Sequence, residues 1–239
     1  MIRTPENDDS DSHRIATRTP DPPVAPRHTL PRSLRLNAVV NAVRAGKHVA
    51  DPGFDAIYPE RVRVFSWRYW TPVEVARRAA QLLVTSDSTR VLDIGSGAGK
   101  FCLVGALATR GTFTGIEHRR HLVEVAQWVA ERYRAPRAEY RHGDMRDVDW
   151  RAFNAFYFFN PFGEHVFGAD ERLDALVDLT PERAESDRAF VLAALERAPV
   201  GTRVATYYGL GCDLPESYDR VQREPAGPGV LDLWVKARG

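Results

Sequence analysis

The apolar positions along the chain fall into short runs that alternate with longer stretches of helical spacing. Such runs are typical of strands buried on both faces of a parallel sheet. They predict strands at 91–94, 112–117, 155–159 and 202–208. A strand is also expected at 138–142, and a closing antiparallel pair at 218–223 and 231–235. Apolar residues three and four positions apart predict helices at 34–49, 71–84, 100–110, 118–134, 170–179 and 180–198.

Taken in order, these elements predict an α/β fold. The sheet is expected to be mostly parallel and seven-stranded, with helices on both faces and an antiparallel pair at its C-terminal end. Residues 1–31 are rich in Asp, Ser, Thr, Pro and Arg and are predicted to be a disordered tail. Residues 32–85 are predicted to be an N-terminal helical and aromatic segment, and residues 86–239 to carry the sheet.

The N-terminal segment contains several local signals. The D-P-G sequence at 51–53 is expected to end the first helix. Thr71, Pro72 and Glu74 have the spacing of a capping box, so Thr71 is expected to cap the helix that follows. Aromatic residues are concentrated at 54–70. They are explained either by packing of this segment or by a lid over a site, and we expect packing for most of them.

The most informative stretch is V-L-D-I-G-S-G-A-G-K, at 91–100. Its glycines permit a tight turn after a strand and let the backbone approach a ligand at a helix N-terminus. The dinucleotide-binding pattern G-x-G-x-x-G fails, because Lys100 stands in place of the third glycine. The P-loop ending G-K-[ST] also fails, because Phe101 follows Lys100.

The pattern that remains, Asp93 followed by Gly95, Gly97 and Gly99, resembles motif I of the class I S-adenosylmethionine-dependent methyltransferases. The resemblance covers about residues 90–235. It implies the seven-stranded Rossmann-like fold of that family. It also implies S-adenosyl-L-methionine as cofactor, with the loop around the amino acid and ribose portions.

Two acids stand at the ends of the next two predicted strands. Glu117 follows Gly95 by 22 residues, a spacing at which a carboxylate can accept both ribose hydroxyls. The resemblance implies that Asp144 accepts from the adenine amine and that Met145 packs on the ring. Taken singly, Glu117 could be a helix cap and Asp144 a turn residue. The full set of predicted cofactor-binding residues is Asp93, Gly95, Ser96, Gly97, Gly99, Glu117, His118, Gly143, Asp144, Met145 and Asn160.

The acceptor side is predicted from Asn160, Pro161 and Phe162, which are the predicted catalytic residues. They resemble a shortened form of the [D/N/S]-P-P-[Y/F] motif of amino-group methyltransferases, with one proline where that motif has two. The resemblance implies that Asn160 accepts a hydrogen bond from the target nitrogen and that Phe162 packs beside it. A strand-ending turn explains the Asn-Pro pair equally well. His165 could serve as a base, although a surface histidine is the simpler explanation.

Composition narrows the classes of function. The net charge is +1 and there is no long basic run, so no nucleic-acid partner is expected. The two cysteines give neither a disulfide framework nor the spacing of metal ligands, so no metal is expected. No leader or membrane-spanning segment is visible, so we expect a cytoplasmic protein without a membrane partner.

These features predict an S-adenosylmethionine-dependent methyltransferase that modifies nitrogen on a small molecule or a protein side chain. Two alternatives keep the same fold. One is a non-catalytic module that binds a cofactor or a partner. The other is an NAD(P)-dependent oxidoreductase, which is disfavoured by Lys100 and by the lack of a Tyr-x-x-x-Lys pair.

Overall fold

A seven-stranded sheet in the order β3-β2-β1-β4-β5-β7-β6 organises the computed structural model, which describes residues 31–166, 172–174 and 176–239. Neighbouring strands from β3 through β5 are parallel, and β7 runs antiparallel to both β5 and β6. The predicted fold class is therefore confirmed. The strands are β1 (Arg90–Ile94), β2 (Thr112–Glu117), β3 (Ala138–His142), β4 (Ala155–Phe159), β5 (Arg203–Tyr207), β6 (Tyr218–Ala226) and β7 (Gly229–Lys236).

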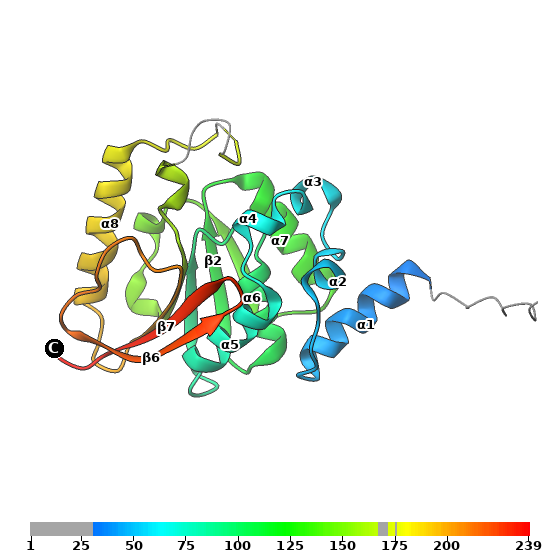
Figure 1. Ribbon diagram of the computed structural model, residues 1–239, viewed down its shortest axis with the longest axis horizontal. Coiled ribbons are helices and arrows are strands. Elements are labelled where there is room, and N and C mark those ends of the chain that lie inside the picture. Colours follow the sequence, from blue (N-terminus) through cyan, green and yellow to red (C-terminus); the bar gives the residue numbers. More distant parts are fainter. Residues whose placement is uncertain (1–30, 167–171, 175) are drawn as a thin grey trace, which may run out of the picture. The chain divides into compact units, whose positions relative to one another are not determined.

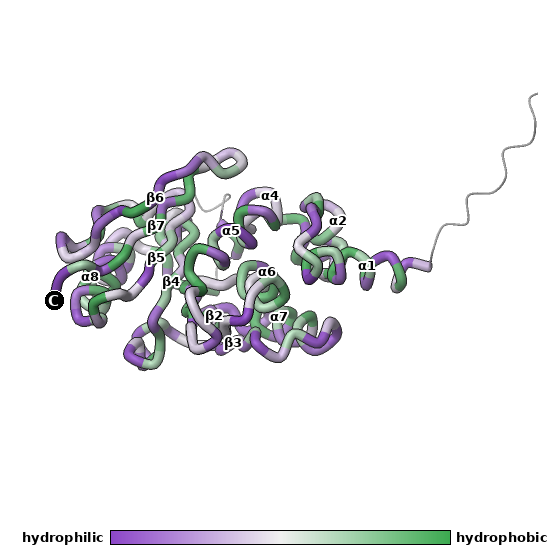
Figure 2. Tube along the Cα trace, turned by 90° about the horizontal axis from the view of Figure 1, so that it is seen from below, coloured by the Kyte–Doolittle hydropathy of each residue, from purple (hydrophilic) through white to green (hydrophobic). Residues whose placement is uncertain are grey.

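Helices cover both faces of the sheet (Figure 1). Figure 2 shows α8 on one side of β4 and β5, and α5 and α6 on the other. The α-helices are α1 (Arg32–Arg44), α2 (Asp51–Asp55), α3 (Glu60–Arg63), α4 (Ser66–Tyr69), α5 (Val73–Leu83), α6 (Lys100–Ala108), α7 (Arg120–Arg132) and α8 (Pro181–Glu196). Within the described ranges, the short 3-10 helices are η1 (Met145–Asp147), η2 (Trp150–Ala152) and η3 (Gly163–Val166).

The central strands are rich in apolar residues because both of their faces are buried. In β4, Ala155 and Tyr157 belong to the core cluster that also contains α1, α5, α6 and α7. Phe156 and Phe158, which alternate with them, belong to the second cluster, together with α8. The period of two along a strand thus distributes one apolar run between two cores.

Some predicted helix boundaries are wrong. The first helix ends at Arg44, and the residues at 51–53 begin the short helix α2 instead of ending α1. No helix is found among the described residues between 170 and 179, which form bends. The predicted tail falls outside the described residues except for Pro31. No helix in the described ranges is long and apolar enough to cross a membrane.

The predicted capping box at α5 is also wrong. The Thr71 hydroxyl contacts the Tyr157 hydroxyl at 2.8 Å, away from the helix end. The Val73 N–H instead donates to Asp51 Oδ1 at 2.8 Å. A residue 22 positions earlier therefore supplies the cap. A local sequence pattern could not reveal this, since the tertiary fold brings α2 to the start of α5.

Lys100 joins the N-terminal segment to the helix that follows the glycine loop. Its ammonium lies 2.6 Å from Asp51 Oδ1 and 2.6 Å from Asp55 Oδ1, and its side chain is 4% exposed. The Phe54 and Trp70 rings lie within 6.0 Å of the same nitrogen. Lys100 thus holds α2 against α6. It stands where the dinucleotide-binding pattern has its third glycine.

We expect Lys100→Met to lower the free energy of unfolding by about 3 kcal/mol, because it leaves buried Asp55 without its partner. Burial already raises the pKa of Asp55, so this carboxyl would take up a proton. Lys47→Met, at an exposed position, should change stability by less than about 0.5 kcal/mol. Urea denaturation measures both. Equal small losses would show that the ion pair does not stabilise the fold.

Candidate active site

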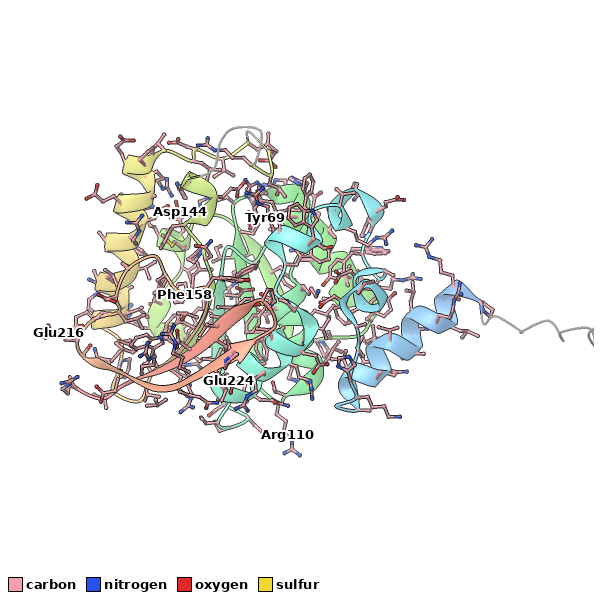
Figure 3. All side chains as sticks on the ribbon, viewed as in Figure 1. Tyr69, Arg110, Asp144, Phe158, Glu216 and Glu224 are labelled. Atoms are coloured by element: carbon pink, nitrogen blue, oxygen red, sulfur yellow. The ribbon has the colours of Figure 1, made fainter. Side chains whose placement is uncertain are left out.

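A cavity of about 940 Å³ opens at the carboxyl ends of the parallel strands. This is the edge of an open α/β sheet at which ligands bind. The volume lies near the upper end of the range for small-molecule sites, so the cavity can hold two ligands side by side. Tyr69 and Asp144 both line it and lie toward one end of the strands in Figure 3, while Arg110 lies toward the other.

The glycine loop forms one wall of the cavity. Gly95, Gly97 and Gly99 all have positive φ, at 73°, 54° and 81°. A Cβ atom placed on Gly95 or Gly97 would have no other atom within 4 Å, and both residues line the cavity. A side chain at either position would therefore enter the space of a ligand, which is the property expected of a backbone cradle.

Glu117 is fixed beside this loop. The side chain is buried, and Oε2 accepts from the Gly97 N–H at 2.9 Å. Oε1 accepts from the Arg119 N–H at 2.9 Å. A carboxylate has about four lone-pair sites, so these two hydrogen bonds leave capacity for ribose hydroxyls. Glu117 lines the cavity together with His118 and Gly143.

Three of the predicted cofactor residues do not line the cavity: Asp93, Ser96 and Gly99. Asp93 is buried, accepts from the Cys102 Sγ–H at 3.5 Å, and burial raises its pKa to about 7. Ser96 packs on Gly115 of β2, where an added Cβ would lie 2.5 Å from the serine Oγ. In this structure the three residues support the loop by packing and do not face the cavity.

Gly99 is required by packing. An added Cβ would lie 2.3 Å from the Tyr140 ring and 2.7 Å from Ala126. The Tyr140 hydroxyl also donates to the Gly99 carbonyl at 2.8 Å. The third glycine of the loop therefore lets α6 approach α7 and β3.

Asp144 and Met145 line the cavity after β3. The Asp144 carboxylate accepts from the Arg146 N–H at 2.8 Å and pairs with the Arg183 guanidinium of α8. Burial acts to raise the pKa of Asp144, but these hydrogen bonds outweigh it and lower the pKa. The carboxylate is thus ionised at neutral pH, and one of its oxygens already pairs with Arg183 of α8.

The residues after β4 and β5 adopt unusual backbone conformations at the cavity. Asn160 has φ 37° and Tyr208 has φ 62°, although neither is glycine. Positive φ is rare for bulky residues and tends to occur at functional sites. Asn160, Pro161, Phe162 and Tyr208 all line the cavity. The predicted catalytic residues are therefore brought to the same space as the glycine loop.

Arg119 is a cavity residue that the sequence did not single out. It is 7% exposed, and its guanidinium donates to Glu164 Oε1 at 2.8 Å and to Asp174 Oδ1 at 2.9 Å. Burial acts to lower the pKa of Arg119, while Asp174, Glu164 and Glu117 raise it. It ties the chain after β4 to the end of β2. In the sequence it stands in the run H-R-R, which looks like the exposed start of a helix.

His165 is not at the surface. It is 8% exposed, lines the cavity, and its Nδ1 lies 3.1 Å from the Thr180 carbonyl oxygen. Among the described residues, no group of three or more His, Cys, Asp or Glu side chains could hold a metal ion.

Aromatic residues of the N-terminal segment take both of the roles considered for them. Phe54 and Tyr58 are buried in the core. The others line the cavity over the carboxyl edge of the sheet, and they are Phe65, Trp67, Tyr69 and Trp70. More of these side chains reach the site than the packing interpretation predicts.

Comparison with a family model places the chain near known methyltransferases. The model of protein-L-isoaspartate(D-aspartate) O-methyltransferase matches residues 65–156, less than half of the chain. This part contains the glycine loop, Glu117 and Asp144. It ends before Asn160. No curated protein sequence matches the chain.

Two solved structures share the fold. One is an RNA methyltransferase from Salinibacter ruber in complex with S-adenosyl-L-homocysteine, 19% identical, with a TM-score of 0.51 over 71% of this chain and 94% of that one. The other is TrmN from Thermus thermophilus, 18% identical, with a TM-score of 0.53 over 72% of this chain and 51% of that one. The chain has the fold of the class I S-adenosylmethionine-dependent methyltransferases. The family match supports methyltransferase activity with S-adenosylmethionine as methyl donor.

Substituting Gly99 should mainly reduce stability, whereas substituting Gly97 should mainly reduce cofactor binding. Both variants carry left-handed strain of about 1–2 kcal/mol. Gly99→Ala adds the clash with Tyr140 and should show the larger fall in the free energy of unfolding. Gly97→Ala should retain more stability but bind S-adenosylhomocysteine much more weakly, because its methyl group enters the cavity. Thermal unfolding and calorimetry separate the two. Equal affinities in the two variants would remove Gly97 from the binding surface.

Proposed function

We propose that the protein is an S-adenosylmethionine-dependent methyltransferase that methylates a nitrogen atom of a small molecule or a protein side chain. The observation that carries this proposal is the shared cavity. Gly95, Gly97 and Glu117 line one part of it, and Asn160 lines another. A donor and an acceptor can therefore lie side by side in one cavity.

The residues present suit the proposed cofactor. Gly95 and Gly97 offer backbone without side chains, and Glu117 offers an immobilised carboxylate for the ribose hydroxyls. We propose that Met145 packs on the adenine and that Asp144 accepts from its amine; both residues line the cavity. When bound, S-adenosylmethionine supplies an electrophilic methyl group on a sulfonium. The protein has to hold the acceptor close and aligned in a dry pocket, which alone can be worth roughly 7–11 kcal/mol.

Asn160 is proposed to orient the acceptor. Its exposed side chain follows β4, and its backbone is tied by the Asn160 N–H to the Tyr207 carbonyl at 3.2 Å. The side-chain carbonyl can accept from an acceptor N–H and so turn the nitrogen lone pair toward the methyl group. Because the family match ends before Asn160, the O-methyltransferase description does not bear on residues 160–162.

Calorimetry tests the cofactor class. S-adenosylmethionine and S-adenosylhomocysteine should bind the protein, while NAD should not. Glu117→Gln should weaken the binding of S-adenosylhomocysteine by about 10- to 100-fold, because a charge-assisted hydrogen bond is worth about 1.5–3 kcal/mol.

Glu139→Gln is the matched control, since Glu139 is an exposed acid on the neighbouring strand β3. Its affinity should stay within about twofold of the unaltered protein. Unchanged affinity in Glu117→Gln, or tight binding of NAD, would refute the proposed cofactor site.

Methyl transfer from tritium-labelled S-adenosylmethionine into a cell extract tests the acceptor residues. We expect label in the small-molecule or the protein fraction, and Asn160→Gly should lower the transfer at least about 100-fold. Glycine keeps the positive φ of this position, so S-adenosylhomocysteine affinity should hardly change. Normal transfer by this variant would reduce Asn160 to a turn residue. Label found only in RNA would contradict the proposed acceptor class.

A further inference from the structure

The part of the cavity around Asn160 has a composition of its own. We define the acceptor half as the lining residues contributed by 61–72, by the ends of β4 and β5, and by the β6–β7 turn. It contains two arginines, no carboxylate and no lysine. Its residues are Arg61, Val62, Phe65, Trp67, Arg68, Tyr69, Trp70, Pro72, Phe159, Asn160, Pro161, Phe162, Tyr207, Tyr208 and Pro228.

Two groups of aromatic side chains line this half, and they come from distant parts of the sequence. One group belongs to α4 and its flanks, where Trp67 is 81% exposed. The other is a cluster after β4 and β5, with Tyr207 and Tyr208 at 4.6 Å between ring centroids and Phe159 at 5.9 Å from Tyr208. An 81% exposed tryptophan beside a cavity offers ring surface for a planar ligand to cover.

Aromatic groups of this kind can also bind a cation, so the two cases must be separated. The Arg68 guanidinium lies 5.9 Å from the Trp67 ring centroid and 5.9 Å from that of Tyr69. The Lys100 ammonium lies 5.7 Å from the Trp70 ring. These rings therefore already interact with cations of the protein itself. Asp51 and Asp55 pair with Lys100, so this ammonium does not itself repel a cationic acceptor. The ring faces are already engaged with cations of the protein, which leaves less ring surface for a second cation.

The acids that line the cavity lie outside the acceptor half. Most of them bind arginines or backbone amides: Glu117, Asp144, Glu164, Asp174 and Asp187. The remaining acid, Asp178, is exposed on the 176–179 stretch, outside the acceptor half. Arg61, by contrast, is exposed at the cavity, and no ion pair is found for it among the described residues. It is available to bind an anionic group.

We propose that the acceptor is a small planar aromatic amine that carries an anionic substituent, with its ring between the two aromatic groups and its anion at Arg61. This inference rests on the proposed function and narrows its substrate class. It favours a small molecule over a lysine side chain, which is a flexible cation. The net charge of +1 gives no support for a nucleic-acid strand.

A matched set of three ligands tests the proposal on the full-length protein saturated with S-adenosylhomocysteine. The ligands are 3-aminobenzoate, 3-aminobenzamide and 3-aminobenzylamine, which share the ring and the aromatic amine but are anionic, neutral and cationic at pH 7.5. Calorimetric affinities should fall in that order. Arg61→Gln should remove at least about 10-fold of the preference for the benzoate over the amide. Trp67→Leu should weaken all three by about 5- to 100-fold.

Two control variants carry the same two substitutions at positions outside the cavity. Arg110→Gln removes an arginine whose side chain is 82% exposed, and Trp128→Leu removes a tryptophan that is 47% exposed on α7. Both should leave the three affinities within about twofold.

Several results would overturn the inference. They are tightest binding of the benzylamine, no binding of any of the three ligands, an undiminished preference for the benzoate over the benzamide in Arg61→Gln, and tighter binding of a lysine peptide or a single-stranded RNA. Failure of S-adenosylhomocysteine itself to bind would instead refute the proposed function, so the two failures are distinguishable.

Discussion

Two neighbouring parallel strands end at the same edge of the sheet, and the Glu117 carboxylate joins their ends. It accepts from the Gly97 N–H of the loop after β1 and from the Arg119 N–H after β2. These hydrogen bonds fix the loop at positive φ beside a buried acid. The Gly95 and Ser96 N–H groups also donate to the Ile116 carbonyl, at 3.0 and 3.1 Å, so the loop is held to β2 through both backbone and side chain. The wall of the candidate cofactor site therefore depends on this carboxylate as well as on the glycines.

The second half of the site depends on how the N-terminal segment is held. Lys100 stands at the start of the helix after the loop and pairs with Asp51 and Asp55 of α2. Asp51 in turn accepts from the first N–H of α5. This polar cluster holds the chain on both sides of residues 56–72, so the aromatic side chains of that stretch reach the cavity. The same lysine that breaks the dinucleotide pattern thus organises the proposed acceptor half.

Elements whose signals are local could be predicted from the sequence. The bounds of β2 and β4 match the prediction, because strands buried on both faces leave little choice of register. The bounds of β3 match as well, although it is an edge strand with exposed Glu139, Arg141 and His142. The cap of α5 could not be predicted, since Asp51 reaches it through tertiary structure. Gly99 and Ser96 do not line the cavity, and motif spacing could not show this, because it does not tell which glycine faces a ligand and which faces Tyr140. Arg119 could not be recognised as a site residue from the sequence, because only its burial distinguishes it from the adjacent His118 and Arg120.

The central claim is that the carboxyl edge between the glycine loop and Glu117 holds an adenosyl cofactor, with the acceptor beside it at Asn160. A crystal structure of the protein grown with S-adenosylhomocysteine tests this most directly. The account predicts ribose hydroxyls at the Glu117 carboxylate, the adenine next to Met145, and the sulfur directed toward Asn160. Density for the ligand elsewhere, or a cavity filled by protein side chains with Glu117 bonded only to backbone, would contradict it.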